Sequence, residues 1–429
     1  MKSSKSKNKN VPQQTDIAIV GGGLVGASLA CCLGKLCPEL NVSVIEAQTI
    51  PLQSPTNNAR HVSYDTRGTA LSYGTRKIYE HIDLWEQMAP YATPIHKVHV
   101  SDKSHLGTTC IDRDDEKIEA LGYVVENQCI GPVLLKKIAA MPNVHWYNPA
   151  VVSDIKVLAD RMRVYLSCDD LKGREPEAID AKLVVVCDGV DSPMRNKLGI
   201  DVNVRSYEQH AVIANVSASL PHNNVAYERF TDLGPMALLP LNEFGVMQAD
   251  HRCALVWTLP TAKALEVLQL NDEAFLQLLQ ERFGNRLGNF IRAGKRYSYP
   301  LNLVTAVEQV RSGLVIMGNA AHSLHPVAGQ GYNLAVRDLF CLAQILAQAA
   351  KAGKSIGSLV VLNDYLLQQK RDQAMVVEFS DKLVKLFSNN NTVLAVGRNL
   401  GLLAMDLLPG IKPIFSRYAT GQGNKIVHN

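Results

Sequence analysis

The sequence predicts an α/β fold: a Rossmann-type domain, an inserted and mainly antiparallel β-sheet, and a helical C-terminal region. Three observations support this prediction. A strand, a glycine-rich turn and a helix open the chain near residue 16, and short β segments repeat between residues 207 and 259. Beyond Gly331 the pattern is helical almost to Pro409.

The N-terminal unit is a βαβ arrangement. A β-branched run from Asp16 to Val20 predicts a buried strand, and an amphipathic pattern from Leu24 to Lys35 predicts the helix that follows. A second strand is expected from Val42 to Glu46. Strand, helix and strand in this order form the start of a parallel sheet.

The turn between the first strand and its helix has the spacing G-x-G-x-x-G. Gly21 allows the tight turn, Gly23 lets a pyrophosphate approach the backbone, and Gly26 lets the helix pack closely on the strand. Glu46 follows Gly26 by twenty residues, where an acid can bind ribose hydroxyls. This pattern predicts a dinucleotide but does not distinguish FAD from NAD. The alternatives are a glycine-rich turn of another α/β protein and, for Glu46 alone, a solvated acid.

The middle of the chain predicts a second sheet, because short β segments alternate there with few helices until Asn271–Phe283. Four large apolar residues on these segments either line a substrate surface or form the core of the sheet. They are Met236, Leu238, Leu255 and Trp257.

Composition excludes several classes of protein. A formal charge of +4 over 429 residues argues against a nucleic-acid partner. Nine cysteines without a C-x-x-C pair, and no secretory signal, predict reduced thiols in a cytoplasmic protein. No apolar run is long enough to span a bilayer. His96, His99 and His105 lack the Cys or carboxylate pattern of a metal site, so no metal is expected.

Two further segments identify the dinucleotide. The run Leu183–Arg195 contains Asp188-Gly189 and resembles the D-G-x-x-S-x-x-R segment of the flavin-dependent aromatic hydroxylases. The run Gly318–Asp338 resembles the third FAD segment of that family, and its part from His325 to Asp338 resembles the ubiquinone-biosynthesis hydroxylases. Further matching segments extend this resemblance almost from end to end.

The resemblance implies a division into domains. Residues 15–75, 121–204 and 295–350 would form a discontinuous Rossmann-type FAD-binding domain. Residues 76–120 and 205–294 would form the substrate domain, residues 351–415 a helical C-terminal region, and residues 1–14 and 416–429 flexible tails.

The resemblance also assigns cofactor contacts. The ADP half of FAD would contact Gly21, Gly23, Gly26, Glu46 and Arg67, and Asp188 would organise the same half. Asn319, where most of the superfamily has Asp, would meet the ribitol chain. The loop that opens the long helix would meet the flavin ring through Pro326, Gly329, Gly331 and Asn333. Where relatives often have Gln or Arg, Pro132 and Val133 stand, so we expect backbone to make that contact.

The resemblance implies a monooxygenase. NAD(P)H, or a separate electron-donor protein, would reduce the flavin, oxygen would add to form a C4a-hydroperoxide, and the ring of a polyprenylated methoxyphenol in ubiquinone biosynthesis would take the distal oxygen. Another ring position, another aromatic substrate, and an inactive flavin-binding subunit of a biosynthetic complex remain as alternatives. No catalytic residue is assigned, because packing explains His322 and His325 as well as catalysis does. Contacts with a ubiquinone-biosynthesis complex and with the inner membrane stay open.

Overall fold

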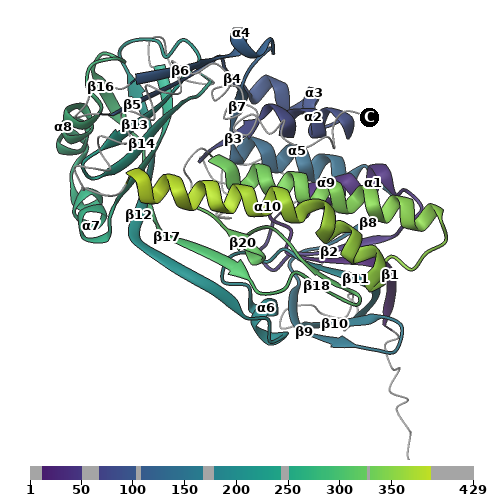
Figure 1. Cartoon of the computed structure of the whole chain (residues 1–429). Helices are drawn as coiled ribbons and strands as arrows, with labels where there is room; N and C mark the ends of the chain where they lie inside the picture. Colours follow the sequence, from purple (N-terminus) through teal and green to yellow (C-terminus); the bar gives the residue numbers. More distant parts are fainter. Residues whose placement is uncertain are drawn as a thin grey trace, which may run out of the picture.

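The computed structural model describes residues 12–50, 67–102, 108–167, 178–242, 251–325 and 329–387. Within these ranges the strands form three sheets, which we call the first, large and small sheets. The first sheet and its helices lie at one end of the molecule, and the large sheet lies at the other (Figure 1). The predicted α/β class with a mainly antiparallel second sheet is confirmed.

The first sheet has the order β18-β19-β11-β1-β2-β8, with β10 on β11 and β9 on β10. Strands β19, β11, β1, β2 and β8 run parallel, as a βαβ beginning requires. The strands are β1 (Gln13–Val20), β2 (Val42–Ile45), β8 (Val144–Tyr147), β9 (Val151–Val157), β10 (Met162–Ser167), β11 (Ala178–Val186), β18 (Val310–Arg311) and β19 (Leu314–Ile316).

The two faces of the first sheet are covered differently. Ile17 and Ile19 of β1 belong to a core built with helices, whereas Ala18 and Val20 belong to a core built with β9 and β10. This alternation follows from the pleat, which points successive side chains to opposite faces. The covering helices are α1 (Leu24–Leu36), α5 (Asn127–Ala139), α9 (Gln330–Lys351) and α10 (Leu359–Phe387), and α6 (Pro193–Lys197) lies on the other face.

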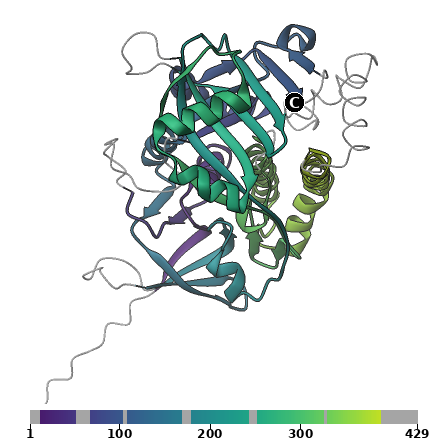
Figure 2. The ribbon, with the colours of Figure 1, turned by 90° about the vertical axis from the view of Figure 1, so that its left-hand side faces the viewer.

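The large sheet has the order β20-β17-β12-β15-β14-β13-β5-β6, with β16 beside β12. The helices α7 and α8 cover its outer face, toward the viewer in Figure 2. The elements are β5 (Lys97–Asp102), β6 (Thr108–Asp112), β12 (Val202–Ala218), β13 (Val225–Thr231), β14 (Gly234–Pro240), β15 (His251–Pro260), β16 (Phe290–Ala293), β17 (Tyr297–Ala306), β20 (His322–Ser323), α7 (Thr261–Gln269) and α8 (Asp272–Phe283).

The small sheet joins the other two. It has the order β3-β7-β4 and is accompanied by short helices. One face packs into the helix-covered core through Leu71, Tyr123 and Val125, and the other meets the large sheet. The elements are β3 (Gly68–Ser72), β4 (Thr93–Ile95), β7 (Gly122–Glu126), α2 (Tyr73–His81), α3 (Trp85–Met88), η2 (Ala89–Tyr91) and α4 (Arg113–Glu116).

The packing of two segments differs from the division expected from the sequence. Within residues 76–120, α2 and α3 bury Ile78, Tyr79 and Trp85 in the helix-covered core, and only β5 and β6 join the large sheet. At the other boundary, β17 lies within residues 295–350 but pairs with β12 of the large sheet. An amphipathic helix shows that it covers a core, but its pattern does not show which one.

Candidate functional site

The predicted cofactor segments converge at one edge of the first sheet, where its parallel strands end. Backbone hydrogen bonds between neighbouring strands continue just past the strand ends. The N–H of Met317 donates to the carbonyl of Val186 at 2.9 Å, and the N–H of Cys187 donates to the carbonyl of Val20 at 2.7 Å. The N–H of Gly21 donates to the carbonyl of Ile45 at 2.9 Å. The segments that follow β19, β11, β1 and β2 therefore lie side by side, the usual place for a ligand in such sheets.

The glycine turn is packed against backbone. Gly21 has φ of +99°, and a Cβ there would lie 2.7 Å from the carbonyl oxygen of Cys187. A Cβ on Gly26 would lie 1.9 Å from the carbonyl oxygen of Gly21. Gly23 is the N-cap of α1, so the free N–H groups of the first helical turn begin at this edge.

Glu46 shapes the turn from the next strand. Its Oε2 accepts a hydrogen bond from the N–H of Gly22, and its Oε1 accepts one from the N–H of Gln48, both at 2.7 Å. The side chain is 5% exposed. The acid expected at this position is therefore present at the turn, and it is held by backbone on both sides.

Asp188 follows β11 at the same edge. Its Oδ2 accepts a hydrogen bond from the N–H of Met194 at 3.1 Å. Its Oδ1 is buried and has no hydrogen-bond partner in the part of the chain that the structure describes. Burial raises the pKa of this carboxyl above its ordinary value. A buried acceptor without a donor fits a hydroxyl of a bound dinucleotide.

Asn319 reaches the edge from β19. It lies in η3 (Gly318–Ala320), and its side chain is exposed. Gly318 has φ of +61°, and a Cβ there would lie 3.1 Å from the side chain of Val25 in α1. Asn319 therefore stands next to the start of α1, as a contact with the middle of a dinucleotide requires.

The helix α9 begins beside the small sheet. Gly329, its N-cap, is in the left-handed conformation with φ of +60°, and a Cβ there would lie 3.1 Å from the Cβ of Ala70. A Cβ on Gly331 would meet nothing within 4 Å among the described residues. No described atom therefore fills the space beside Gly331 in the first turn of this 22-residue helix, at the end where its dipole favours negative charge.

Asn333 holds this turn in place. Its Nδ2 donates to the carbonyl oxygens of Ala70 and Gly329 at 2.8 and 2.7 Å. Its Oδ1 accepts hydrogen bonds from the N–H of Ser72 and the hydroxyl of Thr75 at 2.8 and 2.7 Å. All four hydrogen-bonding positions of the amide are used within the protein, so Asn333 positions Gly329, and its predicted contact with the cofactor is left to backbone.

Arg67 is placed by a contact with the large sheet. The guanidinium of Arg67 stands over the ring of Tyr299 in β17, 4.9 Å from its centroid, between the small and large sheets. Pro326 lies outside the described residues. Pro132 and Val133, which occupy positions where relatives often have Gln or Arg, lie within α5.

The inner face of the large sheet, which we define as the face turned toward the small sheet, adds residues that the sequence did not indicate. A Cβ on Gly68 of β3 would lie 2.9 Å from the Cβ of Ala254 in β15. Arg252 and Asn215, on the same face, donate to the carboxylate of Glu126 at 2.9 and 3.0 Å. The inner face is therefore fixed against β3 and β7 of the small sheet, and β3 also packs against Gly329 through Ala70.

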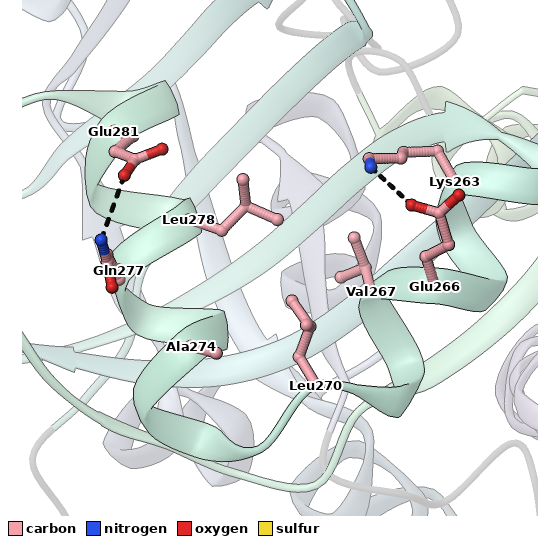
Figure 3. A pocket seen from close by; sticks show the side chains of 8 residues that line it. All are labelled: Lys263, Glu266, Val267, Leu270, Ala274, Gln277, Leu278 and Glu281. Atoms are coloured by element: carbon pink, nitrogen blue, oxygen red, sulfur yellow. Dashed lines mark hydrogen bonds and ion pairs between the residues drawn. The ribbon is translucent and has the colours of Figure 1, made fainter.

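The outer face resolves the alternative left open for the apolar residues. Met236, Leu238, Leu255 and Trp257 have no exposed surface and form a core with α7 and α8. A shallow hollow between these helices is lined by Lys263, Glu266 and Leu270, among others (Figure 3). It lies on the side of the sheet away from Gly329, so it does not belong to the candidate site.

Two of the described histidines, His322 and His325, are buried within the protein. Among the described residues no group of three or more His, Cys, Asp or Glu side chains could hold a metal ion. His325 is buried against Tyr207, and burial lowers its pKa to about 4. His322 stands 3.2 Å from the carboxylate of Asp338, inside the protein.

The arrangement defines a class of protein, a FAD-dependent oxidoreductase, because glycine turn, buried acid and helix start all face one edge. The chain belongs to the family described as FAD binding domain, whose model matches residues 14–359. FAD is its cofactor, and two features of the described residues fit it. A Cβ on Gly331 would meet none of their atoms within 4 Å, and Oδ1 of Asp188 has no hydrogen-bond partner among them.

Similar proteins of known name cover almost the whole chain. The chain is 32% identical to ubiquinone hydroxylase UbiL of Rhodospirillum rubrum over 95% of its length and 89% of that protein. It is 30% identical to the 3-demethoxyubiquinol 3-hydroxylase of Escherichia coli over 95% of its length and 99% of that protein.

A solved structure shares the fold. The p-nitrophenol 4-monooxygenase PnpA of Pseudomonas putida superposes with a TM-score of 0.75 at 17% identity, covering 94% of this chain and 97% of that one.

Proposed function

We propose that the chain hydroxylates the aromatic ring of a prenylated methoxyphenol in ubiquinone biosynthesis. The observation that carries the proposal is the shared edge of Gly21, Asp188 and Asn319 beside an open helix start at Gly331, in a chain similar over nearly its whole length to ubiquinone hydroxylases. FAD supplies the oxygen chemistry, with NAD(P)H and O2 as co-substrates.

The residues at the edge have separate roles in this proposal. The turn at Gly21, Gly23 and Gly26 binds the pyrophosphate, and Glu46 faces the ribose. Asp188 and Asn319 receive hydroxyls of the dinucleotide, and the first turn of α9 meets the flavin ring through its N–H groups. The dipole of α9 stabilises negative charge on the reduced ring. Arg67 lies at the boundary between cofactor and substrate in this proposal, since its guanidinium stands over Tyr299 of the large sheet.

The domain division is part of the same proposal. The first sheet with its helices binds FAD, and the large sheet covers the ring and holds the substrate. Tight packing between Gly68 and Ala254 supports a fixed arrangement of the two. It would orient the ring and exclude water from the reacting atoms.

Product analysis tests the proposal. The protein is loaded with FAD, supplied with NADPH or NADH and with a 2-methoxyphenol that carries a short prenyl chain. Mass spectrometry should find a product heavier by one oxygen atom, and 18O2 should supply that atom. NMR then gives the ring position. Consumption of NAD(P)H with hydrogen peroxide as the sole product, on this substrate and on other prenylated phenols, would refute the proposal.

We also propose that the protein contacts a membrane surface and a biosynthetic complex. No described helix is long and apolar enough to cross a bilayer. On α10, Val360 and Leu367 are 69% and 73% exposed, and Lys370 and Arg371 lie nearby on exposed positions. Apolar and basic side chains together suit an anionic lipid surface. Sedimentation with anionic vesicles, compared for wild type and Leu367→Gln, tests this contact.

A further inference from the structure

The inner face of the large sheet carries one acid in an apolar row. Strand β13 turns Ala226, Glu228 and Phe230 to this face, because Tyr227 and Arg229 contact α8 on the outer face. Across the neighbouring strands, Glu228 pairs in register with Val100 of β5 and Ala237 of β14.

The same row continues across the sheet. Ala237 pairs with Val256, Val256 pairs with Ile213, and Ile213 pairs with Tyr297. We call these six positions the Glu228 row: Val100, Glu228, Ala237, Val256, Ile213 and Tyr297. Each of them is partly accessible, whereas the residues on either side of Ala237, Val256 and Ile213 are buried in the core of the outer face. An apolar surface with partly accessible side chains inside the molecule suits an aromatic ring.

The Glu228 carboxyl has no hydrogen bond or ion pair with any residue in the described ranges, and the surrounding protein atoms raise its pKa to about 7. Other charged groups on this face are Asp102, two residues beyond Val100 on β5, and Arg252, which Glu126 neutralises. Two cations lie over tyrosine rings of β17 on the same face, Arg67 over Tyr299 and Lys295 over Tyr297. From the small sheet, Val124 and Ile95 contribute apolar side chains. The carboxyl therefore keeps its proton-binding capacity near neutral pH.

The row lies next to the start of α9. Gly68 and Ala70 share one face of β3, and the first contacts Ala254 of β15 while the second contacts Gly329. Ala254 lies two strands from Ala226, a separation of about 10 Å, and Ala226 precedes Glu228 by two residues on the same face.

From this juxtaposition we propose that Glu228 is the base that accepts the phenolic proton of the substrate. The inference rests on the proposed function, since it needs a phenol as substrate. The O–H bond of the phenol breaks, its electron pair stays on oxygen, and an O–H bond forms on the carboxylate. The phenoxide is more electron-rich at its ring carbons, which favours their attack on an electrophilic oxygen. After the reaction the carboxylic acid returns the proton to the product or to water.

Glu228→Gln tests the inference, because glutamine keeps the shape and cannot take the proton. With the prenylated 2-methoxyphenol, kcat should fall about 100-fold or more. FAD content and the rate of flavin reduction by NAD(P)H without substrate should match wild type. The rise of kcat with pH near 7 should vanish. Fluorine on the phenol lowers the pKa of its hydroxyl, and the loss in the variant should become smaller with this substrate.

Two comparisons separate the outcomes. Glu266→Gln on α7, whose carboxylate faces Lys263 on the far side of the sheet, should keep wild-type turnover. Glu228→Asp should recover part of the activity. If wild type makes product and Glu228→Gln does so at the same rate with the same pH profile, the role of Glu228 is refuted and the hydroxylase function stands. If wild type makes no product from any prenylated phenol, the proposed function fails first.

Discussion

Arg252 and Glu126 join the large sheet to the small sheet. One guanidinium nitrogen of Arg252 donates to Oε1 of Glu126 at 2.9 Å, and the other donates to Oε2 at 3.3 Å. The two side chains are 17% and 13% exposed, so water screens the pair only weakly. The pair fixes the inner face of the large sheet against β7 of the small sheet.

Replacing Arg252 with Met should destabilise the fold, because it removes the charge and leaves the Glu126 carboxylate poorly solvated. We expect a loss of about 3 kcal/mol in the free energy of unfolding, measured with urea. Lys263→Met breaks an exposed pair with Glu266 and should cost less than about 0.5 kcal/mol. Equal effects of the two variants would show that the Arg252 pair contributes no more than a surface pair.

Two glycine variants distinguish a packing role from a cofactor role. Gly26→Ala places a Cβ against the carbonyl oxygen of Gly21 and should destabilise the protein without FAD by about 3 kcal/mol or more. Gly331→Ala meets open space and should leave that stability unchanged or slightly higher. Its Kd for FAD, from flavin fluorescence, should rise at least tenfold. Unchanged FAD affinity in Gly331→Ala would show that the cofactor does not contact the start of α9.

Two asparagines give a second contrast. Asn333→Ala leaves the buried backbone groups of Ser72, Ala70 and Gly329 without partners and should cost about 3 kcal/mol of stability. Asn319 is exposed, so Asn319→Ala should change stability by less than about 0.5 kcal/mol. Its FAD affinity should nevertheless fall, and calorimetric titration of the unliganded protein measures this. A loss of stability in Asn319→Ala comparable with that of Asn333→Ala would contradict the assignment.

His325 should make stability depend on pH. Burial lowers its pKa from 6.5 to about 4, so the unfolded chain binds a proton that the folded chain does not between these values. Stability from this residue is present above pH 6.5 and is lost as pH falls toward 4. The full loss is about 3 kcal/mol. His325→Gln should reduce the slope of unfolding free energy against pH in this window, and an unchanged slope would refute the assignment.

Local patterns predicted the parts of the fold that depend on neighbours in sequence. The first strand, its helix and the glycine turn follow from a few residues each, and α1 begins at Leu24 as expected. The helix α8 likewise begins one residue after the expected Asn271. Turn geometry and helix caps act within one or two turns, so the sequence carries them directly.

Long-range pairings account for what the sequence did not show. Asn333 binds Ala70, which lies 263 residues earlier in the chain, so nothing near Asn333 indicates its partners. Glu228 gains its apolar surroundings when β13 pairs in parallel with β5, at Val100. In the sequence, the one available signal for the role of Glu228 was an acid between two apolar residues, Ala226 and Phe230, that face the same side of the strand. Arg67 reaches Tyr299 only after the sheets have packed.

The pairing of β19 with β11 has a consequence for the order of folding. Val184 lies beside Leu314, and the chain between them forms most of the large sheet. Closing so long a loop costs entropy, which the large sheet reduces by forming first. Asn319, just after β19, therefore joins the edge late, and the nascent chain cannot complete its cofactor site before its last third is made. We expect FAD binding, followed during refolding by flavin fluorescence, to lag behind protection of the amides of β12 and β15 from hydrogen exchange.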